Sequence, residues 1–464
     1  MIFNSIDFLL FLAIVFVVYW SIKKTGIKWQ NTLILLASYF FYGYWDWRFL
    51  GLIIFSTLVD FYAGIKIDEA KTKKGKQIFL ALSLIVNLGL LGFFKYFNFF
   101  VDSFIEAFNF AGLKLDPWSL KIILPVGISF YTFQTLSYSI DIYKGKLKPT
   151  KDIIGFAAFV SFFPQLVAGP IERAYHLLPQ FYKKRIFTFE NTANGLALML
   201  YGFFKKVVIA DRLAPYVNNV FDHYTDYNTP TLVIAAVFFS FQIYCDFSGY
   251  SLIARGVAKM FGFDLMVNFN RPYLAKNFSD FWKRWHISLS SWFRDYVYIP
   301  LGGNRVNKGR VYLNLMIVFL VSGLWHGANW TFVIWGALHG LYLILNQLFK
   351  KVNLPKFINV LFVYTLVVFA WIFFRSDTIS DAFLYIKQLG QFNVEYNLVS
   401  LCAETGVLNL FTSIFTLILL VTSYFLPRNL EFSSLLKYCI FNIVLLVIMY
   451  LLGTNEQTEF IYFQ

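Results

Sequence analysis

Two histidines that each follow a tryptophan are the residues of this sequence best suited to chemistry. His286 lies at the edge of an aromatic amphipathic segment, and His326 lies inside a strongly apolar run. An imidazole buried in a bilayer is energetically costly, so it usually faces a polar cavity and acts there. Imidazole is also the side chain best matched to proton transfer near neutral pH. We therefore expect His286 and His326 to form a reaction centre.

The residues next to His326 favour a substrate path at this point. Gly327 allows another backbone or a substrate to approach closely. Asn329 offers an amide donor, and the indole of Trp325 can line a channel. The alternative is a structural histidine that donates a hydrogen bond to a backbone carbonyl between helices.

The segment around His286 combines positive charge with aromatic rings. Lys283 and Arg284 precede Trp285 and His286, and Arg294 follows on the same segment. Such a segment can bind an anionic group at the cytosolic mouth of a path through the membrane. The alternative is an interfacial helix whose Lys and Arg side chains extend to water while their stems stay in the membrane surface.

Acidic and amide side chains also occur in apolar surroundings. Gln134, Tyr138 and Asp141 share one stripe of a helix, and Asp246 lies within a long apolar run. These side chains can line a polar path. Internal ion pairing is the alternative explanation for the two carboxylates.

The composition excludes a water-soluble protein. Hydrophobic residues make up 58% of the 464 residues, and the mean hydropathy is +0.60. A soluble domain of this composition would expose too much apolar surface. Apolar runs near the ~20 residues that a spanning helix needs recur along the chain. We predict an all-α polytopic membrane protein with about ten to twelve transmembrane helices and additional re-entrant and interfacial helices.

Charge and turn residues predict the arrangement of these helices. The net charge of +14 comes from Lys and Arg in short loops, and the alternation of basic and non-basic loops places the N-terminus outside the cytosol. The short apolar run at 153–168 contains Pro164 and has basic residues on both sides, so we expect a re-entrant element. We expect spans at 312–323, at 325–349 with His326 near its start, and at 408–426.

We expect a single transmembrane domain over 1–464, with N-terminal helices at 1–150, a core with both histidines at 151–350, and C-terminal helices at 351–464. The sequence has no Walker A motif, Rossmann glycine pattern, zincin motif or C-x-x-C pair. We therefore expect no metal and no tightly bound cofactor.

Several long motifs resemble the membrane-bound O-acyltransferase family, and within it the bacterial branch that acetylates polysaccharides such as alginate. The first two are W-H-I-S-L-S-S-W-F-R-D-Y-V-Y-I-P-L-G-G-N-R at 285–305 and G-L-W-H-G-A-N-W at 323–330. The others lie at 130–145, 162–173 and 244–251. The resemblance covers most of the chain.

The resemblance implies that His326 is the family's catalytic histidine and that His286 is its second functional polar position. It implies a helical bundle around a central tunnel in the bacterial cytoplasmic membrane. It also implies that acetyl groups pass from cytosolic acetyl-CoA to an extracytoplasmic acceptor, and that a separate exported SGNH-type acetyltransferase completes the transfer to sugar hydroxyls.

The residues suit this chemistry. A hydroxyl that attacks a thioester must lose a proton, and His326 can take it as general base, a role worth typically about 10²–10⁴-fold in rate. Asn329 or the Trp325 indole can stabilise the oxyanion. Lys283, Arg284 and Arg294 can attract the phosphates of CoA.

Three alternative functions remain open at this stage. One is D-alanyl transfer to teichoic acid with a carrier protein. The others are a transporter and a scaffold that anchors exported enzymes; neither needs the histidines for turnover.

Overall fold

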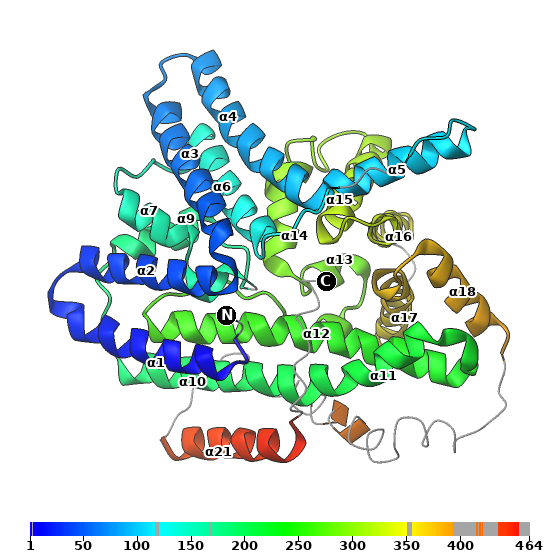
Figure 1. Ribbon diagram of the computed structural model, residues 1–464. Coiled ribbons are helices and arrows are strands. Elements are labelled where there is room, and N and C mark those ends of the chain that lie inside the picture. Colours follow the sequence, from blue (N-terminus) through cyan, green and yellow to red (C-terminus); the bar gives the residue numbers. More distant parts are fainter. Residues whose placement is uncertain are drawn as a thin grey trace. The chain divides into compact units, whose positions relative to one another are not determined.

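The computed structural model describes residues 1, 3–116, 120–167, 169–349, 355–392 and 435–453, and a few positions between 414 and 420. The regular secondary structure of these residues is entirely helical, which confirms the predicted fold class. Figure 1 shows the helices and their labels.

The chain forms two compact units, and the first contains Met1–Gly195 and Ala254–Met266. The boundaries between the units fall within or next to two helices, α10 (Phe189–Phe203) and α12 (Thr229–Met260). The helices of the first unit are α1 (Ile6–Ser21), α2 (Ile27–Asp46), α3 (Leu50–Glu69), α4 (Lys73–Leu91), α5 (Phe97–Phe110), α6 (Ile128–Tyr143), α7 (Ile153–Val160), α8 (Phe163–Leu166) and α9 (Ala174–Leu177).

The second unit contains Leu196–Ile253 and Val267–Gln464. Its helices, apart from the parts of α10 and α12, are α11 (Asp211–Asp222), α13 (Phe278–Trp282), α14 (Ile287–Phe293), α15 (Lys308–His326), α16 (Trp330–Leu348), α17 (Lys356–Arg375), α18 (Ile379–Gly390) and α21 (Leu435–Leu452).

Eight helices among the described residues are long and apolar enough to cross a membrane. The chain is therefore a multi-pass membrane protein. Among these eight stretches, Ile27–Glu69 and Lys73–Phe110 each contain two α-helices, and the count covers the described residues alone. Two apolar helical stretches, Ile153–Leu166 and Tyr438–Leu452, are shorter than a spanning helix, and the first of them coincides with the predicted re-entrant element. The predicted span at 408–426 falls largely outside the described residues.

A buried polar network joins three helices of the first unit, α3, α4 and α6, which pack side by side (Figure 1). The Asp60 carboxylate on α3 accepts hydrogen bonds from Ser83 and, at 2.8 Å, from Asn87, both on α4, and from Ser139 on α6 at 3.1 Å. These bonds satisfy a carboxylate that is fully buried. The network therefore fixes the register of the three helices.

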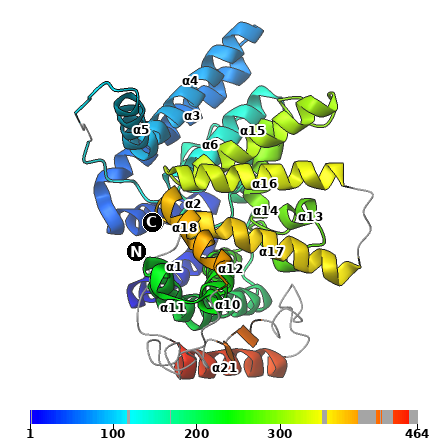
Figure 2. The same ribbon diagram turned by 90° about the vertical axis from the view of Figure 1, so that its right-hand side faces the viewer.

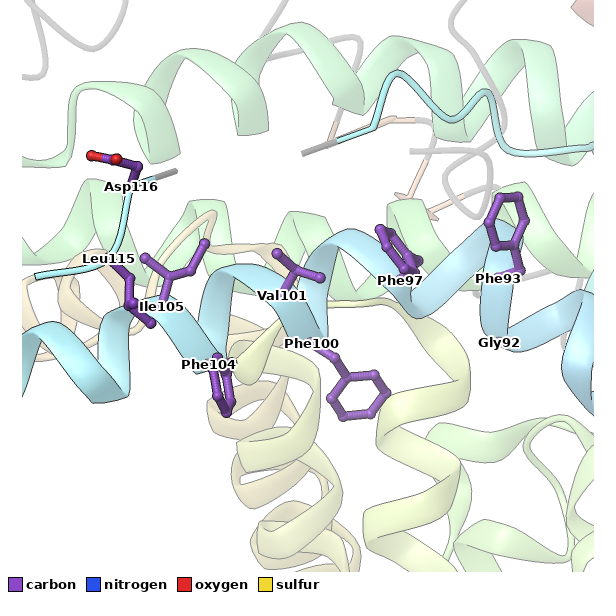
Figure 3. Close-up of a pocket in the computed structure, with 9 residues that line it drawn as sticks. All are labelled: Gly92, Phe93, Phe97, Phe100, Val101, Phe104, Ile105, Leu115 and Asp116. Carbon is purple, nitrogen blue, oxygen red and sulfur yellow. The ribbon is translucent and has the colours of Figure 1, made fainter. Parts of the chain in front are cut away.

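Helix α5 carries an apolar groove of about 780 Å³, lined mainly by its phenylalanine rings (Figure 3). Phe100 and Phe104 are more than half exposed. Among the described residues that line the groove, Asp116 is the only titratable one.

Helices α15 and α16 of the second unit pack closely against each other, and both can be followed in Figure 2. A β-carbon placed on Gly323 would collide with the carbonyl oxygen of Phe332, and one placed on Gly336 would collide with the carbonyl oxygen of Phe319. The two glycines therefore allow the backbones to touch.

The turn between α15 and α16 corrects one sequence prediction. His326 is the last residue of α15, whereas the sequence placed it near the start of the following helix. The reason is the cap at Asn329, whose side chain accepts a hydrogen bond from the backbone N–H of Thr331 at 3.0 Å and so begins α16 at Trp330.

Replacing Gly336 by alanine is expected to destabilise the second unit. Overpacking of this kind costs typically ~1–3 kcal/mol, which exceeds the helix-propensity gain of about 1 kcal/mol. The matched control is Gly89→Ala on α4, where a β-carbon meets nothing within 4 Å. Thermal unfolding in detergent should show a lower midpoint for Gly336→Ala and no decrease for Gly89→Ala. Equal midpoints would contradict the close backbone contact.

Candidate functional site

His286 is completely buried in the second unit and has an unusual backbone conformation. It precedes α14 with φ 41° and ψ 55°, in the left-handed region. Residues other than glycine adopt this region rarely, although histidine does so more often than most. The conformation directs the chain from α13 into α14, and strain of this kind is frequent at functional sites.

Asn268 determines the proton position on His286. The backbone N–H of Ser288 donates to Asn268 Oδ1 at 3.3 Å and the Ser288 hydroxyl donates to it at 2.9 Å, which identifies this atom as the amide oxygen. His286 Nδ1 lies 3.1 Å from the same oxygen. Because the oxygen only accepts hydrogen bonds, Nδ1 carries the proton and Nε2 keeps its lone pair.

The lone pair of His286 is available for a substrate. Among the described residues Nε2 has no hydrogen-bond partner, although the atom is buried. Burial lowers the pKa of His286 to about 3, so the imidazole is neutral at physiological pH. A neutral, oriented imidazole can accept a hydrogen bond from a hydroxyl group.

His326 lies close to His286, with the two ring centres 6.4 Å apart and the rings inclined by 62°. Trp325 and Trp335 each contact the His326 ring at 4.9 Å, and Phe374 contacts it at 5.5 Å. The ring is 8% exposed. The carbonyl end of α15 carries partial negative charge, which stabilises a positive imidazolium at its last residue. His326 is therefore the better placed of the two histidines to accept a proton.

Helix α12 supports the histidine pair through adjacent residues with different roles. Phe247 packs its ring edge-on against His286 at 4.6 Å. Asp246 forms an ion pair with Lys206 at 2.8 Å, and Asp211 pairs with the same lysine at 2.8 Å. All three charged side chains are buried. Asp246 thus holds α12 in place through an internal ion pair.

A cavity of about 1300 Å³ in the second unit has a basic rim and an apolar floor. Lys276, Lys283 and Arg294 contribute the positive charge. The floor consists largely of aromatic and aliphatic side chains from α13 to α17, among them Trp282, Phe319 and Tyr342. Ser322, one turn before His326 on α15, also lines it. The cavity can therefore hold a ligand with a charged end and an apolar or neutral arm.

The predicted basic residues differ in their placement. Lys283 and Arg294 line the cavity. Arg284 instead forms an ion pair with Asp280 at 2.8 Å, one helical turn earlier. Arg294 also contacts Asp295 at 2.8 Å, in a pair whose arginine is largely exposed.

The predicted supporting residues are dispersed. Trp285 is fully buried beside the site, stacked on Phe281 at 5.7 Å. The Asn329 amide donates to the Asp377 carbonyl at 2.7 Å, in addition to its capping bond. Gln134 and Asp141 are buried on α6 in the first unit, where Gln134 donates to the Phe159 carbonyl at 2.8 Å. The structure therefore brings together His286, His326, Trp285 and Trp325, and it gives Asn329 a structural hydrogen-bonding role.

Sequence reasoning missed two residues of this region. Asn268 lies far from His286 in sequence, on an irregular segment, and no local pattern connects them. His339 lies one turn after Trp335 on α16, and the two rings are 4.8 Å apart. The one available signal was the four-residue spacing of Trp335 and His339, which places the two rings on the same helix face.

The described residues contain no group of three or more His, Cys, Asp and Glu side chains that could hold a metal ion.

Comparisons with known proteins agree with the motifs. The family model for the membrane-bound O-acyltransferase family matches residues 150–374, which include both histidines. The chain is 42% identical over 388 residues to the probable alginate O-acetylase AlgI of Azotobacter vinelandii, an alignment that covers 82% of this chain and 76% of the relative.

Two further relatives have other acceptors in their names. The peptidoglycan O-acetyltransferase of Helicobacter pylori is 39% identical over 401 residues, which cover 80% of this chain and 74% of the relative. The teichoic acid D-alanyltransferase of Streptococcus thermophilus is 30% identical over 282 residues, which cover 56% of this chain and 66% of the relative.

Replacing Asn268 by alanine is expected to reduce turnover of the acyl-transfer reaction that the motifs imply. The His286 ring loses the acceptor that fixes its tautomer and orientation, and misplacement of a catalytic group costs up to about 10²-fold. Acyl transfer measured in membranes should fall about tenfold to a hundredfold. Asn268→Asp keeps an oxygen acceptor and should retain more activity than Asn268→Ala. Full activity of a folded Asn268→Ala variant would show that this hydrogen bond is dispensable.

Proposed function

The chain belongs to the membrane-bound O-acyltransferase family, and we propose that it moves acetyl groups from cytosolic acetyl-CoA towards a cell-surface polysaccharide. The protein is a multi-pass membrane O-acyltransferase. The proposal adds the donor, the direction of transfer and the acceptor to that assignment.

The observation that carries the proposal is the pairing of His286 with His326 in the same unit as a basic cavity. His286 presents an unprotonated Nε2, and its ring centre is 6.4 Å from that of His326. A hydroxyl group has one proton, so it can donate to only one imidazole lone pair, at about 2.8 Å. The separation of the rings allows one bound acceptor to reach His326 with its attacking hydroxyl and His286 Nε2 with a second donor group.

We assign the proton transfer to His326. The acceptor hydroxyl attacks the thioester carbon, and its proton moves to the His326 imidazole as the new C–O bond forms. The C–S bond then breaks, and the CoA sulfur takes the proton as the imidazolium returns to its neutral form. His286 positions the acceptor by accepting a hydrogen bond at Nε2 from a second donor group of the substrate, since its Nδ1–H is engaged with Asn268.

The aromatic surroundings protect this reaction from water. Trp285 and Trp335 are fully buried and Trp325 is 5% exposed. Exclusion of water strengthens electrostatic interactions in the site and suppresses hydrolysis of the thioester. The aromatic enclosure thus supports transfer to a sugar hydroxyl over transfer to water.

The basic rim supports a phosphate-bearing donor. Lys276, Lys283 and Arg294 place several cationic side chains on one cavity, and such groups bind phosphates through charge-assisted hydrogen bonds. Acetyl-CoA carries phosphates at one end and the thioester at the other. A cytosolic donor of this kind implies that the rim faces the cytosol of a bacterial cell. The alternation of basic and non-basic loops supports an extracytoplasmic N-terminus.

The acceptor side of the proposal rests on the relatives. Those with the greatest coverage are named for O-acetylation of alginate or of peptidoglycan. We therefore propose a polysaccharide acceptor outside the cytoplasmic membrane. An exported acetyltransferase of the SGNH type would complete the transfer to the sugar hydroxyls.

The test is transfer of radiolabelled acetyl from acetyl-CoA in membranes that contain the wild type or His326→Ala at matched expression. Loss of the general base should reduce transfer by about 10²–10⁴-fold. The control is His223→Ala, because His223 is exposed and lies at the end of α11. This control variant should transfer acetyl at the wild-type rate.

Two outcomes would contradict the proposal. Undiminished transfer by His326→Ala would show that His326 is not the general base. Failure of the wild type with acetyl-CoA, together with transfer from a D-alanylated carrier protein, would replace the proposed donor and acceptor.

A further inference from the structure

His339 on α16 is a buried polar group that the reaction described above leaves unused. Its side chain is 0% exposed. Neither ring nitrogen has a hydrogen-bond partner among the described residues. A neutral imidazole has one N–H to donate and one lone pair to satisfy. Buried groups of this kind normally have partners, so the two vacant positions call for an explanation.

The rings around His339 form an aromatic box. Phe281 stacks on it nearly parallel, at 5.9 Å and 6°. Trp282 and Trp335 meet it edge-on at 5.0 Å and 4.8 Å, and Tyr342 lies at 5.7 Å. An N–H directed at an aromatic face recovers only part of a hydrogen bond. The box therefore positions the imidazole without satisfying it.

This box connects the basic cavity to His326 through shared ring contacts. Trp282, Phe319 and Tyr342 line the cavity, and all three also contact the His339 ring. Trp335 contacts both His339 and His326, at 4.8 Å and 4.9 Å. His339 is thus linked through its neighbouring rings to the basic cavity and to the reaction centre.

We propose that His339 binds the neutral, amide-containing arm of the acyl donor, between the phosphate-binding rim and the thioester. This inference rests on the proposed function. A secondary amide offers one donor and one acceptor, which are the two partners that the imidazole lacks. The order of groups also matches, because acetyl-CoA carries phosphates, then two amides, then the thioester. The ring contacts run in the same order, because Trp282, Phe319 and Tyr342 of the cavity contact His339, and Trp335 contacts both His339 and His326.

Direct binding measurements on the full chain in lipid nanodiscs test this assignment. Radiolabelled acetyl-CoA and its nucleotide fragment, 3′-phospho-ADP, are titrated against wild type, His339→Leu and His339→Gln. Loss of one hydrogen-bonding group should raise the Kd of acetyl-CoA about threefold to tenfold for His339→Leu. The Kd of the nucleotide fragment should not change, since this fragment reaches only the rim.

The second variant and thermal unfolding separate binding from folding. His339→Gln keeps a donor and an acceptor and should bind acetyl-CoA within about twofold of the wild type. His339→Leu removes an unsatisfied buried group, so its unfolding midpoint should be equal to or above that of the wild type. A merely structural histidine would give a lower midpoint and no selective loss of acetyl-CoA.

The assignment is overturned if His339→Leu binds acetyl-CoA as the wild type does, or if it loses both ligands to the same extent. These results leave the proposed function intact. If the wild type itself binds no acetyl-CoA, the proposed donor is wrong, and the assignment of its arm to His339 is wrong with it.

Discussion

The contact between the backbones of α15 and α16 is the constraint on which the reaction centre depends. Gly323 and Gly336 have no side chains, so each helix touches the carbonyl surface of the other. This approach places His326, the last residue of α15, against Trp335 of α16. It also places Phe319 of α15 against His339 of α16, with ring centres 6.4 Å apart. A larger residue at either glycine would separate the two helices and the two histidines they carry.

Hydrogen bonding, charge and aromatic packing have different roles in the site. Asn268 sets the tautomer of His286, and the end of α15 stabilises positive charge on His326. The Lys206 ion pairs hold α12, which carries Phe247 against His286. The indole and phenyl rings exclude water, and Nε2 of His286 and the ring nitrogens of His339 can still bind a substrate. The low dielectric that makes these polar groups costly also strengthens their effect on a transition state.

The sequence predicted the membrane class and the histidine pair because each depends on local composition or on long motifs. Hydrophobic runs identify spanning helices without knowledge of their partners. The helix boundary at His326 was wrong because the cap at Asn329 outweighs hydrophobicity. The Asn329 amide that was expected to stabilise an oxyanion donates to the Asp377 carbonyl instead. Asn268 and His339 were missed because their roles arise from contacts between segments that are distant in sequence. The Arg284–Asp280 pair, by contrast, has helical spacing and could have been predicted.

The central claim is that the acyl group of the donor binds beside His286 and His326, and photoaffinity labelling measures its position directly. Membranes are irradiated with an acyl-CoA analogue that carries a diazirine on the acyl group, and the labelled peptides are identified by mass spectrometry. The predicted labels fall on α14, on the last turns of α15 and on α16, and excess acetyl-CoA should suppress them. Saturable labelling confined to other segments, such as the apolar groove of α5, would contradict the placement of the acyl group at His286 and His326.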